Sequence, residues 1–373
     1  MKKVLFISNV LSHIEAFHLP YLEWFKSRGY EVHIMTNAGG NTAEYCDKLF
    51  DIGIQRSPFN LKNISAIRKA KIIIDSENYQ IIHSHTPMGG VVGRLASTSA
   101  RKKGSKILYT AHGFHFYKGA PKRNWILYYT MEKYLAKKTD CIITINSEDY
   151  ECAKEKFESK QTAIKKISGI GVDLKRFASI SNDEKTQLKK QYGYEDKFLL
   201  IYAAEFIPRK NHSFFIEAAT DLCKLCPNIK FLFCGKGKLM ENVKKQAEER
   251  GVAEYFDFLG FRKDMPTLYK MSDILISAST EEGFGINIIE GMATGMPAVA
   301  SIVRGHKEMV ISGKNGFLFD SSSAKQFNDY IVKLYDDYAL YNGMSLEAVK
   351  TAQSFSIENS LEQMSSIYEK YEK

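Results

Sequence analysis

Residues 279–301, STEEGFGINIIEGMATGMPAVAS, run from the end of an expected strand through a glycine loop into a short helix. Gly283 and Gly285 let backbone N–H groups approach an anion, and the N-terminus of the helix adds a partial positive charge. Gly295 is expected to end the helix, and Pro297 to open the next strand. This arrangement is typical of a phosphate-binding loop in an α/β domain with a parallel sheet.

Two carboxylates frame the loop, because Glu282 lies within it and Glu290 follows eight positions later in the helix. A carboxylate repels phosphate but accepts hydrogen bonds from neutral hydroxyl groups. A ligand with a diphosphate between two polyhydroxylated groups would satisfy both glutamates, and a nucleotide sugar has this layout. The alternative is an ordinary glycine-rich turn with two surface glutamates.

The same strand–helix alternation extends over the whole chain, whose 373 residues suggest about two domains. Two successive runs of buried strands and amphipathic helices predict an α/β protein with two parallel sheets. We expect an N-terminal domain over 1–175, a second domain over 176–355 and a final helix over 356–373. The expected strands are 3–8, 31–36, 80–83, 106–109 and 141–145 in the first domain, and 198–203, 230–234, 255–259, 274–277 and 297–301 in the second.

Charge is distributed unevenly along the chain, which carries a formal +9. Residues 1–175 hold 27 Lys+Arg against 16 Asp+Glu, a net of +11, and the remainder is −2. This asymmetry indicates an anionic partner for the first domain, either nucleic acid, a membrane surface or a phosphorylated ligand, unless it is only a solvated lysine surface. The first residues suit a strand better than a signal peptide, and six cysteines without export signals suggest reduced thiols in the cytosol.

Further polar residues follow other expected strands, where ligands of open α/β sheets bind. Arg209 and Lys210 follow the strand at 198–203 and could neutralise a departing diphosphate. His112 follows the strand at 106–109 and could donate a hydrogen bond to a sugar or phosphate, whereas Ser12 and His13 follow the first strand. The alternative for each histidine is a purely structural role. For His83, His85 and His115, a structural role and a role in the site are about equally favoured.

Other chemistries lack their motifs. The sequence has no P-loop, and Gly235-x-Gly237 lacks the third glycine of a dinucleotide fingerprint because position 240 is Met. Cys223-x-x-Cys226 has no second ligand pair for zinc. Because Asp-x-Asp is also absent, we expect no metal ligands, and Arg, Lys and backbone dipoles are left to stabilise the diphosphate.

The Glu282–Glu290 string, with its Gly-Phe-Gly and Ala-x-Gly-x-Pro elements, resembles the E-x(7)-E signature of the retaining glycosyltransferases of family 4. The resemblance covers nearly the whole chain and implies the GT-B fold, with two facing Rossmann-like domains. The opening residues Ser12-His13-Ile14 replace the family's common Gly-Gly acceptor loop and resemble a polysaccharide-assembly subgroup, which puts the acceptor side at Ser12 and His13.

The resemblance also implies roles for site residues. Glu290 would bind the donor ribose, Glu282 and His112 the donor sugar, and Lys210 the diphosphate, with Arg209 in place of an arginine that the family has earlier in this loop. The backbone of the glycine loop would hold the diphosphate, and two loops after neighbouring strands would receive the base. The residues of these backbone and base contacts are Gly283, Phe284, Gly285, Gly235, Phe261 and Arg262.

From these observations we expect a metal-independent enzyme that needs no cofactor beyond its nucleotide-sugar donor, a UDP-hexose or UDP-N-acetylhexosamine. The expected acceptor is a polyprenyl-diphosphate-linked glycan in cell-surface polysaccharide assembly. The basic, aromatic segment 117–138 would place the protein at the inner face of the cell membrane, and nucleic acid is not an expected partner. A soluble acceptor, or a non-catalytic protein that binds nucleotide sugars, are the alternatives.

Overall fold

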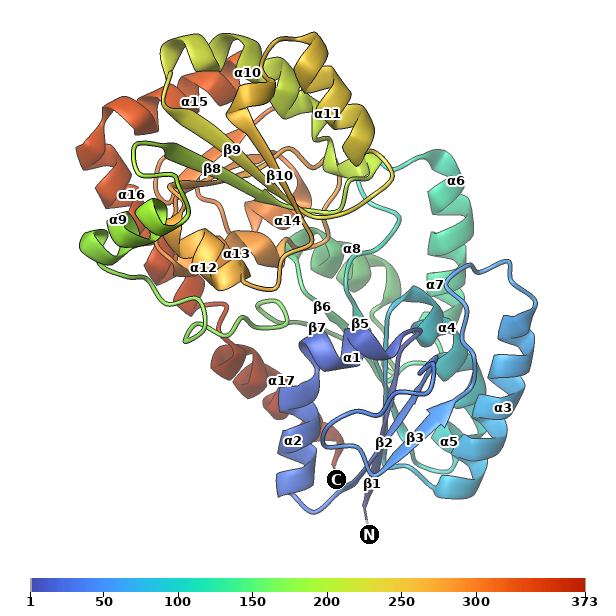
Figure 1. Cartoon of the computed structure of the whole chain (residues 1–373). Helices are drawn as coiled ribbons and strands as arrows, with labels where there is room; N and C mark the ends of the chain where they lie inside the picture. Colours follow the sequence, from blue (N-terminus) through green and yellow to red (C-terminus); the bar gives the residue numbers. More distant parts are fainter. Residues whose placement is uncertain (1, 373) are drawn as a thin grey trace. The chain divides into compact units, whose positions relative to one another are not determined.

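The computed structural model describes residues 2–372, and the chain divides into two compact units (Figure 1). Unit 1 comprises Met1–Gly171 and Ile357–Lys373, and unit 2 comprises Val172–Ser356. The change from unit 1 to unit 2 therefore falls a few residues before the boundary expected from the sequence. Each unit is an α/β domain built on one parallel sheet, as predicted.

The sheet of unit 1 has the strand order β3-β2-β1-β4-β5-β6-β7. Its central strands are continuous buried runs, as expected for a parallel sheet with helices on both faces. Figure 1 shows α3, α4 and α5 on one side of this sheet and α2 with α17 on the other. The strands are β1 (Lys3–Ile7), β2 (Glu31–Thr36), β3 (Lys48–Asp51), β4 (Ile81–His85), β5 (Lys106–Ala111), β6 (Cys141–Thr144) and β7 (Ala163–Lys166).

The helices of unit 1 include the final helix of the chain. The Tyr21 hydroxyl lies 2.7 Å from Ser360 Oγ, and His83 Nδ1 lies 2.7 Å from the Tyr368 hydroxyl, so α17 packs on the first half of the chain. The helices are α1 (Leu11–Phe17), α2 (Leu19–Ser27), α3 (Lys62–Glu77), α4 (Pro87–Ala96), α5 (Thr98–Lys102), α6 (Lys122–Asn124), the π-helical turn η1 (Trp125–Tyr129), α7 (Thr130–Ala136), α8 (Ser147–Phe157) and α17 (Ile357–Tyr371).

Unit 2 repeats the plan with the order β10-β9-β8-β11-β12-β13. Counted within the unit, this is the 3-2-1-4-5-6 order of Rossmann domains, which places a topological switch point between β8 and β11. The strands are β8 (Phe198–Ala203), β9 (Ile229–Cys234), β10 (Phe256–Gly260), β11 (Ile274–Ser277), β12 (Ala298–Ser301) and β13 (Gly316–Phe319).

The helices of unit 2 begin in a stretch expected to lack strands, where Ser181 and Glu184 form a capping box at the start of α9. They are α9 (Asn182–Gln191), η2 (Pro208–Lys210), α10 (Ser213–Leu225), α11 (Met240–Glu249), η3 (Ala253–Tyr255), α12 (Met265–Met271), α13 (Ile286–Ala293), α14 (Arg304–Lys307), α15 (Ala324–Asp336) and α16 (Tyr338–Gln353). Among residues 2–372, no helix combines the length and apolar character needed to cross a membrane.

Candidate functional site

The glycine loop of unit 2 connects β11 to α13 and has a constrained backbone. Gly285 is the N-cap of α13 and has a φ of 113°, a conformation that favours glycine. Gly305 of α14 lies against the loop so closely that a Cβ atom there would be 2.3 Å from the carbonyl oxygen of Phe284. Its N–H donates to the carbonyl oxygen of Glu282 at 3.1 Å. The loop is thus braced by α14 at the N-terminus of α13, a geometry suited to an anion.

Glu282, Lys210 and Arg209 form one charged cluster at the carboxyl ends of the neighbouring strands β8 and β11. Glu282 is buried, and its Oε1 accepts hydrogen bonds from Lys210 Nζ and, at 3.0 Å, from Ser279 Oγ. Arg209 Nη1 lies 3.6 Å from Glu282 Oε2. Burial raises the pKa of Glu282, but Lys210 and the other nearby cations more than offset this, so the pKa is lowered. The carboxylate is therefore ionised at neutral pH and faces two cations.

Glu290 lies on α13, about one turn beyond the glycine loop. Burial raises the pKa of its carboxyl group to about 7, although Arg176 acts in the opposite direction. This carboxyl group therefore changes charge near neutral pH, and a hydroxyl donor would favour the ionised form.

The loops after β9 and β10 hold the other residues predicted for the donor. Gly235 follows β9, where a Cβ atom would lie 2.0 Å from the carbonyl oxygen of Ala204, so only glycine fits. Phe261 follows β10 and is exposed, whereas the Arg262 guanidinium pairs with Asp264, with Nε 2.8 Å from Oδ1. The donor residues predicted in unit 2 thus lie on α13 or follow one of four adjacent strands, β10, β9, β8 and β11, whereas His112 belongs to unit 1.

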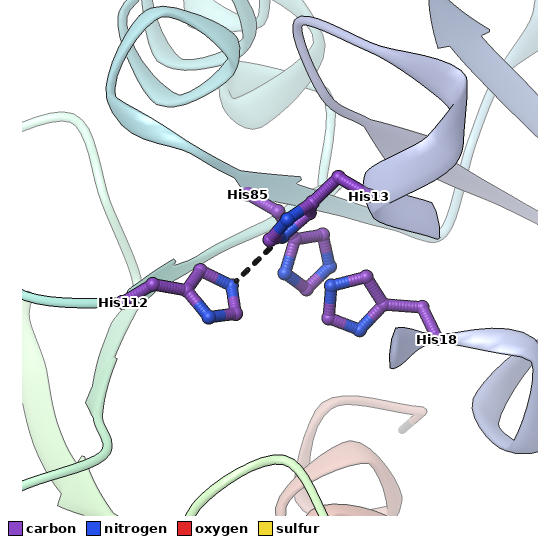
Figure 2. Close-up of side chains that lie close together, drawn as sticks. All are labelled: His13, His18, His85 and His112. Atoms are coloured by element: carbon purple, nitrogen blue, oxygen red, sulfur yellow. Dashed lines mark hydrogen bonds between the residues drawn. The ribbon is translucent and has the colours of Figure 1, made fainter. Parts of the chain in front are cut away.

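The residues predicted in unit 1 lie at the carboxyl ends of β1 and β5. Ser12 is exposed on α1, and the Nε2 atoms of His13 and His112 lie 3.3 Å apart, within hydrogen-bond distance (Figure 2). Burial lowers the pKa of His13 to about 4, and burial with repulsion from His13 lowers that of His112 well below its usual value. Both imidazoles are therefore neutral at pH 7.

Several residues beside these sites were not predicted. Ser279 and Gly305 contact Glu282 or its loop, and the buried His306 Nδ1 donates to the Ser301 carbonyl oxygen at 2.8 Å. His18 is also buried beside His13 and His112, and so is His85, for which the sequence left a site role and a structural role about equally open. In the sequence, the signal for this histidine cluster was that several histidines lie at or after the ends of the expected strands of unit 1. A single histidine at such a position does not indicate a cluster.

Unit 1 also contains a largely apolar pocket of about 570 Å³. His13 and Arg56 contribute its polar wall, while Leu127 and Met131 of the η1–α7 segment are both lining residues and exposed. Its other apolar lining residues include Met88, Val91, Phe114 and Phe116. The pocket can accommodate an apolar chain beside cationic and hydrogen-bonding groups.

Comparisons with known proteins agree with this architecture. The family profile "Glycosyl transferase 4-like" matches residues 3–146, and "Glycosyl transferases group 1" matches residues 183–351. EpsD of Bacillus subtilis (strain 168) is 43% identical over 371 residues, which cover 99% of this chain and 97% of EpsD. The UDP-Gal:alpha-D-GlcNAc-diphosphoundecaprenol alpha-1,3-galactosyltransferase of Escherichia coli is 28% identical over 373 residues, with 96% and 94% coverage.

Among solved structures, Anabaena Alr3699/HepE in complex with UDP and glucose superposes with a TM-score of 0.79 at 20% identity, covering 99% of this chain and 100% of HepE. This likeness concerns the fold, whereas the identity with EpsD extends over nearly the full sequence. The resemblance recognised in the E-x(7)-E string is thereby confirmed, and the chain belongs to the group 1, GT4-like glycosyltransferases of the GT-B fold.

Proposed function

We propose that this glycosyltransferase moves a hexose or N-acetylhexosamine from its UDP-sugar to a lipid-linked glycan, with retention of anomeric configuration, in cell-surface polysaccharide assembly. The observation that carries the proposal is the cluster of Glu282, Lys210 and Arg209 beside the glycine loop at the N-terminus of α13. The names of two similar proteins support the donor and acceptor classes, since one is crystallised with UDP and glucose and the other acts on a diphosphoundecaprenol acceptor.

In the proposed reaction, the acceptor hydroxyl oxygen attacks the anomeric carbon from the face on which the diphosphate departs. The bond between that carbon and the diphosphate oxygen breaks, and the departing diphosphate takes the hydroxyl proton. Lys210, Arg209 and the N–H groups of the Gly283–Gly285 loop stabilise the charge that develops on the diphosphate. Glu282 orients the sugar, and no metal is required at the diphosphate because Lys210, Arg209 and the loop N–H groups supply the positive charge.

Binding of the nucleotide is expected to depend on pH through Glu290. Its carboxyl group has a pKa of about 7, and ribose hydroxyls prefer the carboxylate. Lowering the pH below 7 should therefore weaken binding of UDP-glucose about tenfold per pH unit, because a growing fraction of the free protein is protonated at this site. Calorimetric titration between pH 5.5 and 8 measures this, and the phosphodiester groups of UDP-glucose do not titrate in that range.

A Glu290→Gln variant should bind more weakly at pH 8 and show an almost flat profile. Glu241→Gln, on the exposed surface of α11, is the matched control and should retain the wild-type slope. A wild-type slope in Glu290→Gln would contradict the placement of Glu290 at the ribose.

We further propose that the segment α6–η1–α7 lies on an anionic membrane at the inner face of the cell membrane, where the acceptor's lipid would enter the pocket of unit 1. Ile126 is 73% exposed and Tyr134 is 53% exposed, and the exposed Leu127 and Met131 also line the pocket. Basic side chains surround these apolar groups, as at a membrane surface. The exposed basic residues of the segment are Lys122, Arg123 and Lys133, and the exposed Lys137 follows it directly.

Reversing two of these charges should weaken binding to vesicles. Each basic residue near an anionic surface contributes about 1 kcal/mol, so Lys122→Glu with Lys133→Glu should lower the vesicle partition coefficient about 30-fold or more. Co-sedimentation with phosphatidylglycerol-containing vesicles measures it. The control, Lys62→Glu with Lys69→Glu on the exposed surface of α3, makes the same charge change elsewhere in unit 1. Equal losses in both variants would contradict docking through this segment, and no binding by the wild type would favour a soluble acceptor.

A further inference from the structure

Four histidines from four segments of unit 1 converge on one point. His13 comes from α1, His18 from the junction of α1 and α2, His85 ends β4, and His112 follows β5. One ring nitrogen of each lies within 4.8 Å of the corresponding nitrogen of every other. Figure 2 shows the rings directed toward one another. The cluster thus joins side chains that are up to about a hundred residues apart in sequence.

Hydrogen bonding does not account for this convergence. His18 and His85 are each 1% exposed, and neither of their ring nitrogens has a hydrogen-bond partner among residues 2–372. The single hydrogen bond within the cluster joins His13 to His112. A buried polar group without a partner costs about 1–3 kcal/mol, so two such imidazoles side by side indicate a missing ligand rather than a satisfied core.

We propose that His13, His18, His85 and His112 bind one divalent transition-metal ion of the zinc class. Imidazole is a preferred ligand of Zn²⁺ and related ions, whereas hard cations such as Mg²⁺ prefer oxygen. With Zn–N bonds of about 2.0–2.1 Å, tetrahedral geometry places ligand nitrogens about 3.3 Å apart, which is the separation of His13 Nε2 and His112 Nε2. Burial lowers the pKa of all four side chains, so each imidazole is neutral and able to coordinate at pH 7.

The ring positions require only local adjustment. A tetrahedral site places ring centroids about 5 Å apart, and four of the six pairs lie between 4.6 and 5.7 Å. The His13–His85 pair is wider, at 6.3 Å, and the His18–His85 pair is closer, at 3.8 Å. Coordination would separate the rings of His18 and His85, which are otherwise in close, tilted contact without a hydrogen bond.

A second cluster in unit 1 provides a contrast. Glu31, His33 and Glu77 also lie close enough together to bind an ion. However, His33 bonds to the Tyr79 hydroxyl at 2.7 Å and to Glu31 at 2.7 Å, and lysines pair with both glutamates. The polar atoms of this second cluster have hydrogen-bond or ion-pair partners within the protein, so the cluster gives no indication of a bound ion. The absence of such partners distinguishes the four-histidine cluster.

The proposed ion goes beyond the proposed function. It would link α1 and its junction with α2 to the ends of β4 and β5, and so hold the wall of the apolar pocket at His13. His112 would coordinate through Nε2, which leaves its Nδ1 available for a hydrogen bond to the sugar. The ion belongs to unit 1, whereas the glycine loop and its cations belong to unit 2.

The test is a Co²⁺ titration of the full chain, prepared without a histidine tag and freed of metal with a chelator. We expect one equivalent of Co²⁺ to produce the intense visible bands of four-coordinate cobalt, and Zn²⁺ to abolish them. Zn²⁺ at about 100 times its Kd contributes about 2.7 kcal/mol and should therefore raise the unfolding temperature of the full chain by about 3 °C. These readouts do not depend on sugar transfer, so they remain valid if the proposed function fails.

Variants make the assignment specific. The double variant His18→Ala with His85→Ala should lose the four-coordinate spectrum, whereas each single variant keeps three imidazoles that can bind Co²⁺ with a water as fourth ligand and should bind it more weakly. Circular dichroism shows whether the variants fold. His115→Ala, which removes an exposed imidazole that also lines the pocket, is the matched control and should retain one equivalent. A folded wild-type chain that gives no four-coordinate Co²⁺ spectrum would overturn the proposal, as would an unchanged spectrum and affinity in the folded double variant.

Discussion

Replacing Lys210 by alanine is expected to lower kcat for sugar transfer by about 10²–10³-fold. Lys210 lies beside Arg209 and contacts the buried Glu282 at the edge of the glycine loop. A cation at this position stabilises the charge that develops on the departing diphosphate, and groups of this kind typically contribute such factors. The measurement is the initial rate of UDP release at saturating donor and acceptor.

The control for this variant must address Glu282. Removing Lys210 leaves a buried carboxylate without its strongest partner, which by itself can cost about 3–5 kcal/mol of stability. Thermal unfolding of Lys210→Ala and of Lys210→Ala with Glu282→Gln separates a folding loss from a catalytic one. Lys224→Ala, an exposed lysine on α10, should behave as the wild type in both assays. A folded Lys210→Ala with near-normal kcat would refute the role assigned to Lys210.

A second large effect is expected on stability, from Arg94→Leu. The Arg94 side chain is fully buried, and it makes a two-point ion pair with Glu132 at 2.7 and 2.9 Å. Its Nε also donates to the Gly90 carbonyl oxygen at 2.8 Å, and its guanidinium lies 3.8 Å from the Tyr109 ring centroid. Removing the cation leaves the Glu132 carboxylate buried and unpaired. The free energy of unfolding, measured by urea denaturation, should therefore fall by about 3–5 kcal/mol.

The double variant Arg94→Leu with Glu132→Leu tests the cause. It removes both charges and should regain most of the lost stability, since replacing a buried ion pair with apolar groups is often close to neutral. The ion pair would not link α4 to α7 as described if Arg94→Leu lowered the free energy of unfolding by less than about 1 kcal/mol. The same conclusion would follow if the double variant lost as much stability as Arg94→Leu and Glu132→Leu lose in total.

Ten strands could be predicted, nine of them because they are apolar runs that are almost fully buried, and β2, β8 and β11 have the expected bounds. The tenth, β10, is a half-buried edge strand that has phenylalanines and a leucine. The three strands that were not predicted lie at the edges of the sheets. β3 and β7 are half exposed, and β13 has only four residues beginning with glycine, so none has a long apolar run. Edge strands are specified by pairing with a neighbour, which local sequence does not reveal.

The grouping of the expected donor residues of unit 2 could be anticipated because they belong to short motifs at the ends of neighbouring strands. The glycine loop, Glu282 and Glu290 lie within nine residues of one another, so spacing alone relates them. The pairing of Lys210 with Glu282 joins residues 72 positions apart and depends on the adjacency of β8 and β11. The four-histidine cluster likewise depends on how β1, β4 and β5 lie together, so no single motif predicts it.

The basic, aromatic segment 117–138 shows a different limit. It contains α6, the π-helical turn η1 and α7, and its apolar groups are divided between the pocket and the surface. Trp125 and Tyr129 pack with the core of unit 1, whereas Ile126 is exposed. The spacing of residues in the sequence does not distinguish a π-helical turn from an α-helical one, so it could not assign each side chain to a face.

The central claim is sugar transfer from a UDP-sugar, and the most direct test is UDP release by the full chain. UDP-glucose, UDP-galactose and UDP-N-acetylglucosamine are each incubated with and without vesicles that contain a polyprenyl-diphosphate-linked sugar. The account predicts slow UDP release from one donor alone, acceleration by the lipid acceptor with one sugar added per UDP released, and loss of both in Lys210→Ala. Calorimetric binding of these donors with no UDP release under either condition would contradict it.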